Sequence, residues 1–440
     1  MAEQQGIKAL QANHLQKKIF FTLAFIALYR VGVYIPIPGV DADALSKFFA
    51  QQGGNIFGMF NMFTGGALER FSVVALGVMP YISASIIMQL LTVVIPQLDQ
   101  LQKEGEAGRK KITQYTRYFT MILALIQGFM IGTGLQSQSF LGRPLVVDGG
   151  GLSWLILTSI SLTAGTAFVM WLGEQITERG IGNGISLIIF AGIIAGLPQV
   201  VMNTYSQLHS SSIQLAQVML ILAVVVVIVA GVVYMEQGAR QVPVQYAKRQ
   251  VGNRMYGGQV SHLPMRINSA GVIPPIFASS LLQFPITFAT FSRGGKFADF
   301  VNVAFAQGGW LYNTTYALLI IFFAFFYTSI TFKPDDIAEN LKKHGGFIPG
   351  IRPGARTAEY LQKISDRLTC AGAIYLATLC ISPVILVERF GIPFYFGGTS
   401  LLIVVGVALD TFRQIEAHRQ SLRYDTFLKK GTIRPRRGYT

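Results

Sequence analysis

Side chains that could transfer protons or act as nucleophiles are scarce in the apolar stretches of this chain. The acids nearest to those stretches, Glu174, Glu388 and Asp410, stand at their ends. The five histidines all lie in polar tails or loops, at His14, His209, His262, His344 and His418. No His-Glu-x-x-His, Gly-x-Ser-x-Gly or Gly-x-x-x-x-Gly-Lys-Ser/Thr motif occurs. The sequence therefore predicts no catalytic centre, metal site or cofactor, and any energy source would belong to another chain.

Uncharged groups inside the apolar stretches carry more information. Val78 with Ile82, and Ile185 with Ile189, are four residues apart, so each pair shares one face of a helix. Such pairs are far more often packing or lipid contacts than the lining of a pore. The alternative is a constriction, because a narrow apolar ring offers no hydrogen bonds to a passing chain and resists ions by dewetting. Spacing alone leaves both interpretations open.

The elements that position these residues are membrane-spanning helices. Of the 440 residues, 51% are hydrophobic and 13% are charged, whereas about a quarter are charged in a soluble domain. Apolar windows long enough to cross a bilayer predict ten spans. They cover approximately 19–35, 73–95, 118–135, 152–172, 181–198, 215–234, 270–290, 316–332, 368–387 and 394–412.

The basic residues predict how these spans are oriented. Most of the 36 Lys and Arg residues fall on one side, in 1–18, 96–117, 173–180, 236–267, 333–367 and 413–440. The positive-inside rule places these segments and both termini in the cytoplasm. Arg30, near the outer end of the first span, would snorkel to the headgroups. We interpret the net charge of +15 as topology signalling plus attraction to anionic lipids, with nucleic-acid binding as the other interpretation.

A Gly/Met/Phe segment over residues 57–68 precedes the second span. It cannot cross a bilayer, because a helix of this length reaches only ~18 Å. The second span carries Pro80, Ser83, Ser85 and Gln89 within its apolar run. Short or broken segments at membrane depth are tolerated where they line a cavity or lie inside protein. The two segments together predict a span beside a water-filled space.

Five spans fall in each half of the chain, so the halves are predicted to have opposite orientations, as in inverted-repeat folds. The predicted parts are a cytoplasmic tail, a first half, an external hinge loop, a second half and a basic tail, over 1–18, 19–198, 199–214, 215–412 and 413–440. The loops 236–267 and 333–367 are long for membrane connections. They are either functional surfaces or solvated connectors.

Five long motifs identify a family resemblance. They are Met79-Pro-Tyr-Ile-Ser-Ala-Ser-Ile-Ile-Met-Gln-Leu-Leu91, Glu104-Gly-Glu-Ala-Gly-Arg-Lys-Lys111, Trp171-Leu-Gly-Glu-Gln-Ile-Thr-Glu-Arg-Gly-Ile-Gly-Asn-Gly-Ile-Ser186, Tyr246-Ala-Lys-Arg249 and Pro393-Phe-Tyr-Phe-Gly-Gly-Thr-Ser-Leu-Leu402. In this order they resemble the bacterial SecY family, from about residue 15 to 430. The resemblance implies an all-α polytopic membrane protein. Its ten transmembrane helices would form two inverted five-helix halves around a central pore, with a short plug helix and a lateral gate.

Carried over position by position, the resemblance implies four sets of site residues. The pore ring would be Val78, Ile82, Ile185, Ile189, Ile276 and Ile403. The plug would come from about residues 60–71, including Phe60, Asn61, Met62, Phe63, Thr64, Gly65, Gly66, Ala67 and Leu68. The polar lateral-gate positions would be Ser83, Gln127 and Asn268. The docking surface for SecA or the ribosome would include Lys248, Arg249, Arg254, Arg352 and Arg356.

Some positions complicate this transfer. Val78 stands where isoleucine is common in the family, and Asn253 stands where some relatives have a second basic residue. Pro274-Pro275 adds a proline before Ile276 and leaves the register of that residue open. For the docking arginines the alternative is topology signalling, although docking is favoured for Arg352.

The resemblance implies a passive channel of the bacterial cytoplasmic membrane. It would recognise signal sequences, pass unfolded preproteins outward and release transmembrane segments sideways into lipid. The implied partners are the SecE and SecG subunits, the SecA ATPase, the ribosome and anionic lipids, with ATP hydrolysis residing in SecA. The competing class is a secondary transporter of a small solute, which the missing intramembrane charge disfavours. An intramembrane enzyme would need a nucleophile-base pair or a metal site, and the sequence has neither pattern.

Overall fold

The computed structural model describes residues 2–41, 44–47, 61, 64–137, 139–140, 143–146, 150–210, 214–246, 249–251, 254–256, 260–291, 309–390 and 398–430. Four of the predicted site residues lie outside these ranges, namely Phe60, Met62, Phe63 and Lys248. The chain divides into two compact units, residues 1–199 with 407–440 and residues 200–406.

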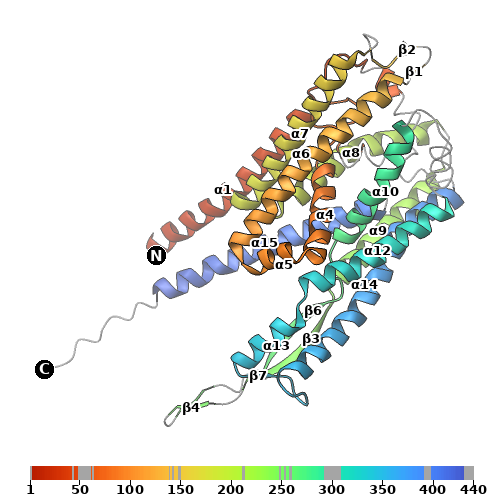
Figure 1. The fold of residues 1–440 in the computed structure, drawn as a ribbon. Coiled ribbons are helices and arrows are strands. Elements are labelled where there is room, and N and C mark those ends of the chain that lie inside the picture. Colours follow the sequence, from red (N-terminus) through yellow and green to blue (C-terminus); the bar gives the residue numbers. More distant parts are fainter. Residues whose placement is uncertain are drawn as a thin grey trace. The chain divides into compact units, whose positions relative to one another are not determined.

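The first unit is mainly helical (Figure 1). Its elements are α1 (Ala2–Val33), α4 (Met79–Val94), α5 (Pro96–Lys103), α6 (Glu106–Ser137), β1 (Ser139–Phe140), β2 (Arg143–Pro144), α7 (Leu152–Arg179) and most of α8 (Gly184–His209), and α15 (Gly398–Lys430) enters it at residue 407. Glycines let α6 and α7 approach closely, because a Cβ on Gly128 would lie 3.2 Å from Ser159 Cα. Small residues allow this kind of contact between membrane helices.

The second predicted span begins later than expected. Residues 73–78 form turns, and α4 begins at Met79 with Pro80 in its first turn. A proline is tolerated there, because the first N–H groups of a helix have no intrahelical partner. The chain then bends by 100° between α4 and α5. Pro96 favours this break, because it holds Ile95 in an extended conformation (φ −99°, ψ 113°).

The predicted helix at 60–71 differs from the structure in its described part. Asn61 is helical, but residues 64–78 form successive turns. Gly65, Gly66 and Gly77 have φ of +67°, +85° and +54°. A right-handed helix does not continue through left-handed residues, and glycine adopts them at little cost. We call Asn61 together with residues 64–78 the turn segment.

The second unit combines helices with short strands. Its elements are α9 (Leu215–Gln237), β3 (Ala239–Tyr246), β4 (Arg249–Val251), β5 (Arg254–Tyr256), β6 (Val260–Arg266), α10 (Ile273–Phe291), α12 (Trp310–Thr331), α13 (Pro334–Lys343), β7 (Gly346–Phe347) and α14 (Ala355–Phe390). Pro274 and Pro275 lie in the first turn of α10, so Ile276 continues the same helix. Phe277 of α10 meets Phe323 of α12 edge to face, with ring centroids 5.7 Å apart.

The two long predicted loops are folded. β3 pairs antiparallel with β6 and with β7, giving the strand order β6-β3-β7. Six buried residues of this region form an apolar core, namely Val242, Val244, Met265, Ile348, Leu361 and Ile364. The interpretation as solvated connectors is therefore wrong for the described parts of 236–267 and 333–367. We call β3, β6, β7, α13 and the start of α14 up to residue 367 the sheet layer.

Each of the ten predicted spans overlaps a helix of the structure. In the described part of the chain, seven helices are long and apolar enough to cross a membrane, or eight if α4 and α5 form one bent span. α10 is also apolar, over Ile273–Leu282. The chain is thus a mostly helical, multi-span membrane protein.

Candidate functional site

The first turns of the turn segment are closed by a reciprocal pair of side-chain hydrogen bonds. Asn61 Nδ2 donates to Glu69 Oε2 over 3.0 Å, and the Glu69 backbone N–H donates to Asn61 Oδ1 over 3.0 Å. The Gly66 N–H also donates to the Asn61 carbonyl, at 2.8 Å. These bonds satisfy polar groups without a helix or a strand, and they tie Asn61 to residues 66–69 in a local turn.

Two neighbouring side chains of α1 hold this turn. The Tyr29 hydroxyl donates to the Thr64 carbonyl at 3.0 Å, and Arg30 Nη1 donates to the Gly65 carbonyl at 2.9 Å. Tyr29 is buried and Arg30 is half-buried. Hydropathy gave Arg30 the headgroups as its expected partner, whereas the structure gives its guanidinium a backbone partner in the turn segment.

The later part of the turn segment is anchored through its backbone. Pro36 and Ser72 form an isolated antiparallel bridge, with the Ile37 N–H donating to the Phe71 carbonyl and the Val73 N–H to the Ile35 carbonyl, each at 2.9 Å. Phe71 has a φ of +45° and is buried. Its ring stacks on Trp154 of α7 with centroids 6.5 Å apart. A bulky residue in this left-handed conformation persists only where the surroundings hold it.

Glycines of α7 and α8 let those helices touch the turn segment. A Cβ on Gly165 of α7 would overlap the Val73 carbonyl, and a Cβ on Gly65 would lie 2.9 Å from Gly192 Cα of α8. The turn segment is thus enclosed by α1, α7 and α8. Non-helical backbone at membrane depth requires such enclosure by protein or by a water-filled cavity.

The predicted ring residues fall in both units. Val78 caps the start of α4, and the Ile82 N–H donates to its carbonyl at 3.0 Å, which confirms the shared face of this pair. Ile189 of α8 is buried, as are Val78 and Ile82, while Ile185 is half-buried. The remaining two predicted members, Ile276 and Ile403, are buried in the second unit. Their closure into one ring stays a prediction.

The glycine-rich motif before Ile185 is a tight turn between α7 and α8. Asn183 Oδ1 accepts hydrogen bonds from the N–H groups of Ile185 at 3.1 Å and Ser186 at 3.4 Å. These bonds satisfy free donors at the start of α8. A Cβ on Gly184 would overlap the Gly173 carbonyl of α7. The motif thereby sets where α8 begins and where Ile185 and Ile189 lie on it.

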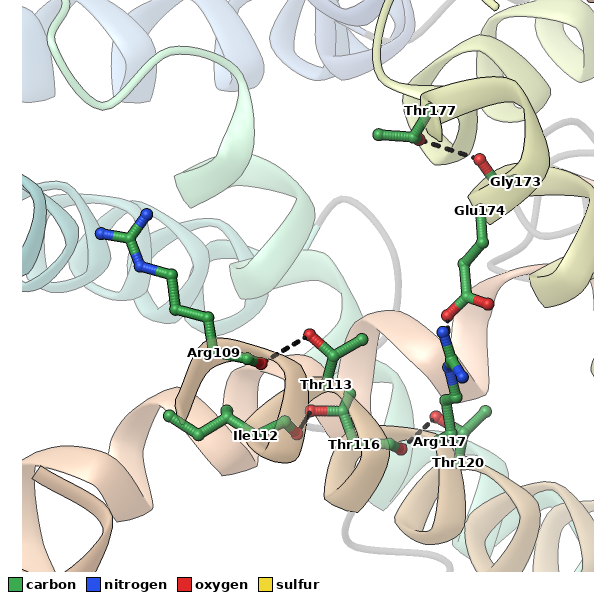
Figure 2. A network of polar contacts seen from close by, with 9 residues as sticks. All are labelled: Arg109, Ile112, Thr113, Thr116, Arg117, Thr120, Gly173, Glu174 and Thr177. Carbon is green, nitrogen blue, oxygen red and sulfur yellow. Dashed lines mark hydrogen bonds and ion pairs between the residues drawn. The ribbon is translucent and has the colours of Figure 1, made fainter. Parts of the chain in front are cut away.

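An ion pair joins α6 to α7 near the predicted cytoplasmic ends of these helices (Figure 2). Arg117 Nε donates to Glu174 Oε1 over 2.7 Å, with Glu174 the more buried partner. The threonines around it bond back to their own helices, as Thr116 does to the Ile112 carbonyl at 2.9 Å. Glu174 therefore serves to hold two helices together.

The predicted gate residues are also divided between the units. Ser83 of α4 is buried and Gln127 of α6 is half-buried, both in the first unit. In the second unit, Asn268 Nδ2 donates to the buried carboxylate of Glu236 at 2.5 Å and to the Gly271 carbonyl at 3.1 Å. Sequence reasoning missed Glu236 because it counted the residue as the first of a polar loop. Its position directly after the apolar run of α9 was the available signal.

Of the described docking residues, Arg356 lies on the sheet layer and Arg352 in the turn that leads into its part of α14. Arg352 is exposed, in the turn between β7 and α14, and its carbonyl accepts the Thr357 hydroxyl at 2.9 Å. Arg356 is exposed on α14, with Nη1 3.9 Å from Glu359 Oε2. A hydrogen bond from Lys363, together with the charges of Lys363 and Arg356, lowers the pKa of Glu359. The backbones of Arg249 and Arg254 lie on the paired strands β4 and β5.

Comparisons with known proteins show which family the chain resembles. The SecY family model matches residues 72–412. "Protein translocase subunit SecY" of Vibrio cholerae is 49% identical over 428 residues, covering 96% of both chains. The Escherichia coli K12 protein of the same name is 47% identical over 441 residues, covering 99% of both. A solved structure described as a protein-conducting channel has a TM-score of 0.64 at 17% identity and covers 93% of each chain.

Proposed function

Because this chain belongs to the SecY family, we propose that its turn segment is the stopper of a protein-conducting pore and that the aliphatic pairs beside it form the constriction. The family assignment itself establishes the general activity. The chain is the channel subunit of the Sec translocon and is not itself an enzyme.

The observation that carries the stopper assignment is the enclosure of residues 64–78 by α1, α7 and α8 without regular secondary structure. Burying non-helical backbone costs free energy unless each of its polar groups finds a hydrogen-bond partner. A segment that merely connected two helices would gain nothing from being enclosed in this way. The segment also leads directly into Val78 and Ile82. We propose that it covers the ring formed by these two residues with Ile185, Ile189, Ile276 and Ile403.

The polar groups at Ser83, Gln127 and Asn268 are proposed to line a lateral gate. Asn268 is held within the second unit by hydrogen bonds to Glu236 and to the Gly271 carbonyl, which fixes one polar side chain of the proposed gate. The modest polarity of the three residues would let the gate shift between two states for a small difference in free energy. A signal sequence would favour the open state, and transmembrane segments would leave through the gate into lipid.

The sheet layer is proposed to be the cytoplasmic docking surface. Arg352 and Arg356 are exposed next to a folded apolar core, which gives a partner a rigid basic platform. Similar folds have been solved as Sec61 in a canine ribosome-channel complex (TM-score 0.60) and as a yeast Ssh1 complex bound to the 80S ribosome (TM-score 0.55). We propose that SecA and the ribosome dock here, that SecE and SecG complete the channel, and that both termini are cytoplasmic in the bacterial inner membrane.

Crosslinking tests the pore assignment. A cysteine at Ile82 should form an adduct with a preprotein arrested during SecA-driven translocation. A cysteine at Val227, which is 70% exposed on α9, is the lipid-facing control and should give no adduct with a secreted preprotein. Absence of an adduct at position 82, while a cysteine at Ile276 or Ile403 crosslinks well, would remove Ile82 from the ring.

A further inference from the structure

We infer that Arg30 is a positioning residue that clamps the turn segment at Gly65 and thereby sets how much the resting channel leaks. The inference rests on the proposed function, because it takes the turn segment to be the stopper. The inference adds the contact on which closure depends. In that contact Gly65 is held between Arg30 of α1 and the backbone of α8.

Gly65 is the point where the clamp closes. Its carbonyl accepts the hydrogen bond from Arg30 Nη1 at 2.9 Å. A Cβ on Gly65 would lie 2.5 Å from the same nitrogen atom and 2.9 Å from Gly192 Cα. The residue is therefore held between a guanidinium on one side and the backbone of α8 on the other, and only glycine fits at φ +67° in that space.

A second contact ties the other end of the same turn to the end of α1. The Arg70 guanidinium lies over the Tyr34 ring, 4.1 Å from its centroid, and the Arg30 guanidinium lies 6.0 Å from that centroid. With Tyr29 bonded to Thr64 and Arg30 to Gly65, residues 64–70 are joined to the short stretch 29–34 at three places. Movement of the turn away from α1 has to break all three contacts.

The clamp is also suited to release. Arg30 contributes one charge-assisted hydrogen bond, and its guanidinium is half-buried, so water can replace the lost carbonyl. The turn keeps its own bonds between Asn61 and Glu69 when the clamp opens. It can therefore move as a folded unit and return to the same place.

Gly65 and Gly66 provide a matched pair of positions. Both have left-handed backbone, with φ of +67° and +85°, so alanine causes similar backbone strain at either. A Cβ on Gly66, however, has nothing within 4 Å. In proteoliposomes containing the full chain with SecE and SecG, Gly65→Ala should raise the resting ion leak about tenfold above Gly66→Ala. Equal leaks from the two variants would overturn the clamp.

Arg30 is tested by a graded series. Arg30→Met removes the donor and should raise the leak, and Tyr29→Phe should raise it less. Arg30→Lys keeps a positively charged donor on a flexible stem and should leave the leak below that of Arg30→Met. SecA-driven translocation should persist in all three, which separates release of the stopper from loss of the fold. If Arg30→Met does not assemble, the comparison of Gly65→Ala with Gly66→Ala tests the clamp instead. A leak that Arg30→Lys leaves as high as Arg30→Met would assign Arg30 a packing role and overturn the inference.

Deletion of residues 61–66 distinguishes the inference from its premise. If the deletion raises the leak and Arg30→Met does not, the clamp is wrong while the stopper stands. If neither raises it, the turn segment is not the stopper and both proposals fail.

Discussion

The sheet layer and the start of the turn segment, at Asn61 and residues 64–66, both lie between membrane spans, and different kinds of contact hold them in place. The sheet layer has a paired three-stranded sheet and an apolar core in which Leu361 is fully buried. Asn61 and residues 64–66 are held by hydrogen bonds to Tyr29, Arg30 and Glu69, and by the close approach of glycine backbones. Among the described residues, burial dominates the contacts of the first region and polar contacts dominate those of the second.

The magnitudes explain how each region can serve its proposed role. Full burial of one large apolar side chain contributes about 1.5–3 kcal/mol, whereas a neutral hydrogen bond contributes about 0.5–1.5 kcal/mol net. A region with six buried core residues keeps its shape when a partner binds. A turn held by a few hydrogen bonds can leave its place and reform them. This contrast fits a rigid docking platform and a releasable stopper.

Loss of core packing in the sheet layer should have the largest effect on stability. Leu361→Ala should lower the free energy of unfolding of this region by about 2–5 kcal/mol, because it leaves a cavity among buried residues. Limited proteolysis and thermal unfolding in detergent would measure the loss. The exposed neighbour Lys363→Ala is the control and should stay near wild type. A raised resting leak in Leu361→Ala would contradict the separation of the two regions.

Charge reversal on the platform should impair docking without affecting closure. Arg352→Glu should reduce SecA-driven translocation about tenfold, since a repulsive charge replaces an attractive one at an exposed contact. Translocation assays at low and high salt would measure it, because screening weakens the effect. Arg356→Glu tests a second position on the same face, where the new carboxylate would stand beside that of Glu359. Undiminished translocation by Arg352→Glu would remove this residue from the docking surface.

Loss of the reciprocal bonds in the turn should open the stopper by a smaller amount. Asn61→Ala removes both side-chain bonds to Glu69 and should destabilise the closed turn by about 1–3 kcal/mol. The readout is a raised ion leak with translocation retained. Glu69→Gln is the matched control, since its amide oxygen still accepts the Asn61 bond. A leak from Glu69→Gln as large as that from Asn61→Ala would show that the charge, and not the bond, closes the turn.

Loss of the ion pair between α6 and α7 should have the smallest effect on stability, and it provides a baseline for the other variants. Arg117→Gln should cost up to about 1 kcal/mol, because the Arg117 side chain is 44% exposed and well solvated. Thermal unfolding with and without added salt would measure it. A loss as large as that of Leu361→Ala would mean that this pair, and not core burial, dominates stability.

Local patterns in the sequence were enough to predict the helices of the membrane part. An apolar run long enough to span a bilayer is a property of consecutive residues, and all ten predicted runs overlap helices. The i,i+4 spacing of Val78 and Ile82 is likewise local, and their backbone hydrogen bond confirms it. The second span was predicted to start at residue 73, but its helix starts at Met79, because residues 73–78 form turns and Gly77 has a left-handed backbone that hydropathy does not register.

Non-local contacts could not be predicted in the same way. Arg30 was expected to reach the headgroups, but its partner is a backbone carbonyl 35 residues away. No residue type signals such a partner, because every residue carries a carbonyl. The sheet layer was missed for a similar reason. β3 pairs with β7 about a hundred residues later, and the buried face of the sheet is completed by α14.

By itself the sequence determined that this chain is a polytopic membrane protein without a catalytic motif, and its motifs identified the family. These properties follow from composition and from residues close together in the chain. The tertiary structure alone decided that residues 64–78 form turns held by α1, α7 and α8, and that the long loops fold around Leu361. Both outcomes depend on backbone groups and apolar faces from distant segments, whose contacts exist only after the helices have packed.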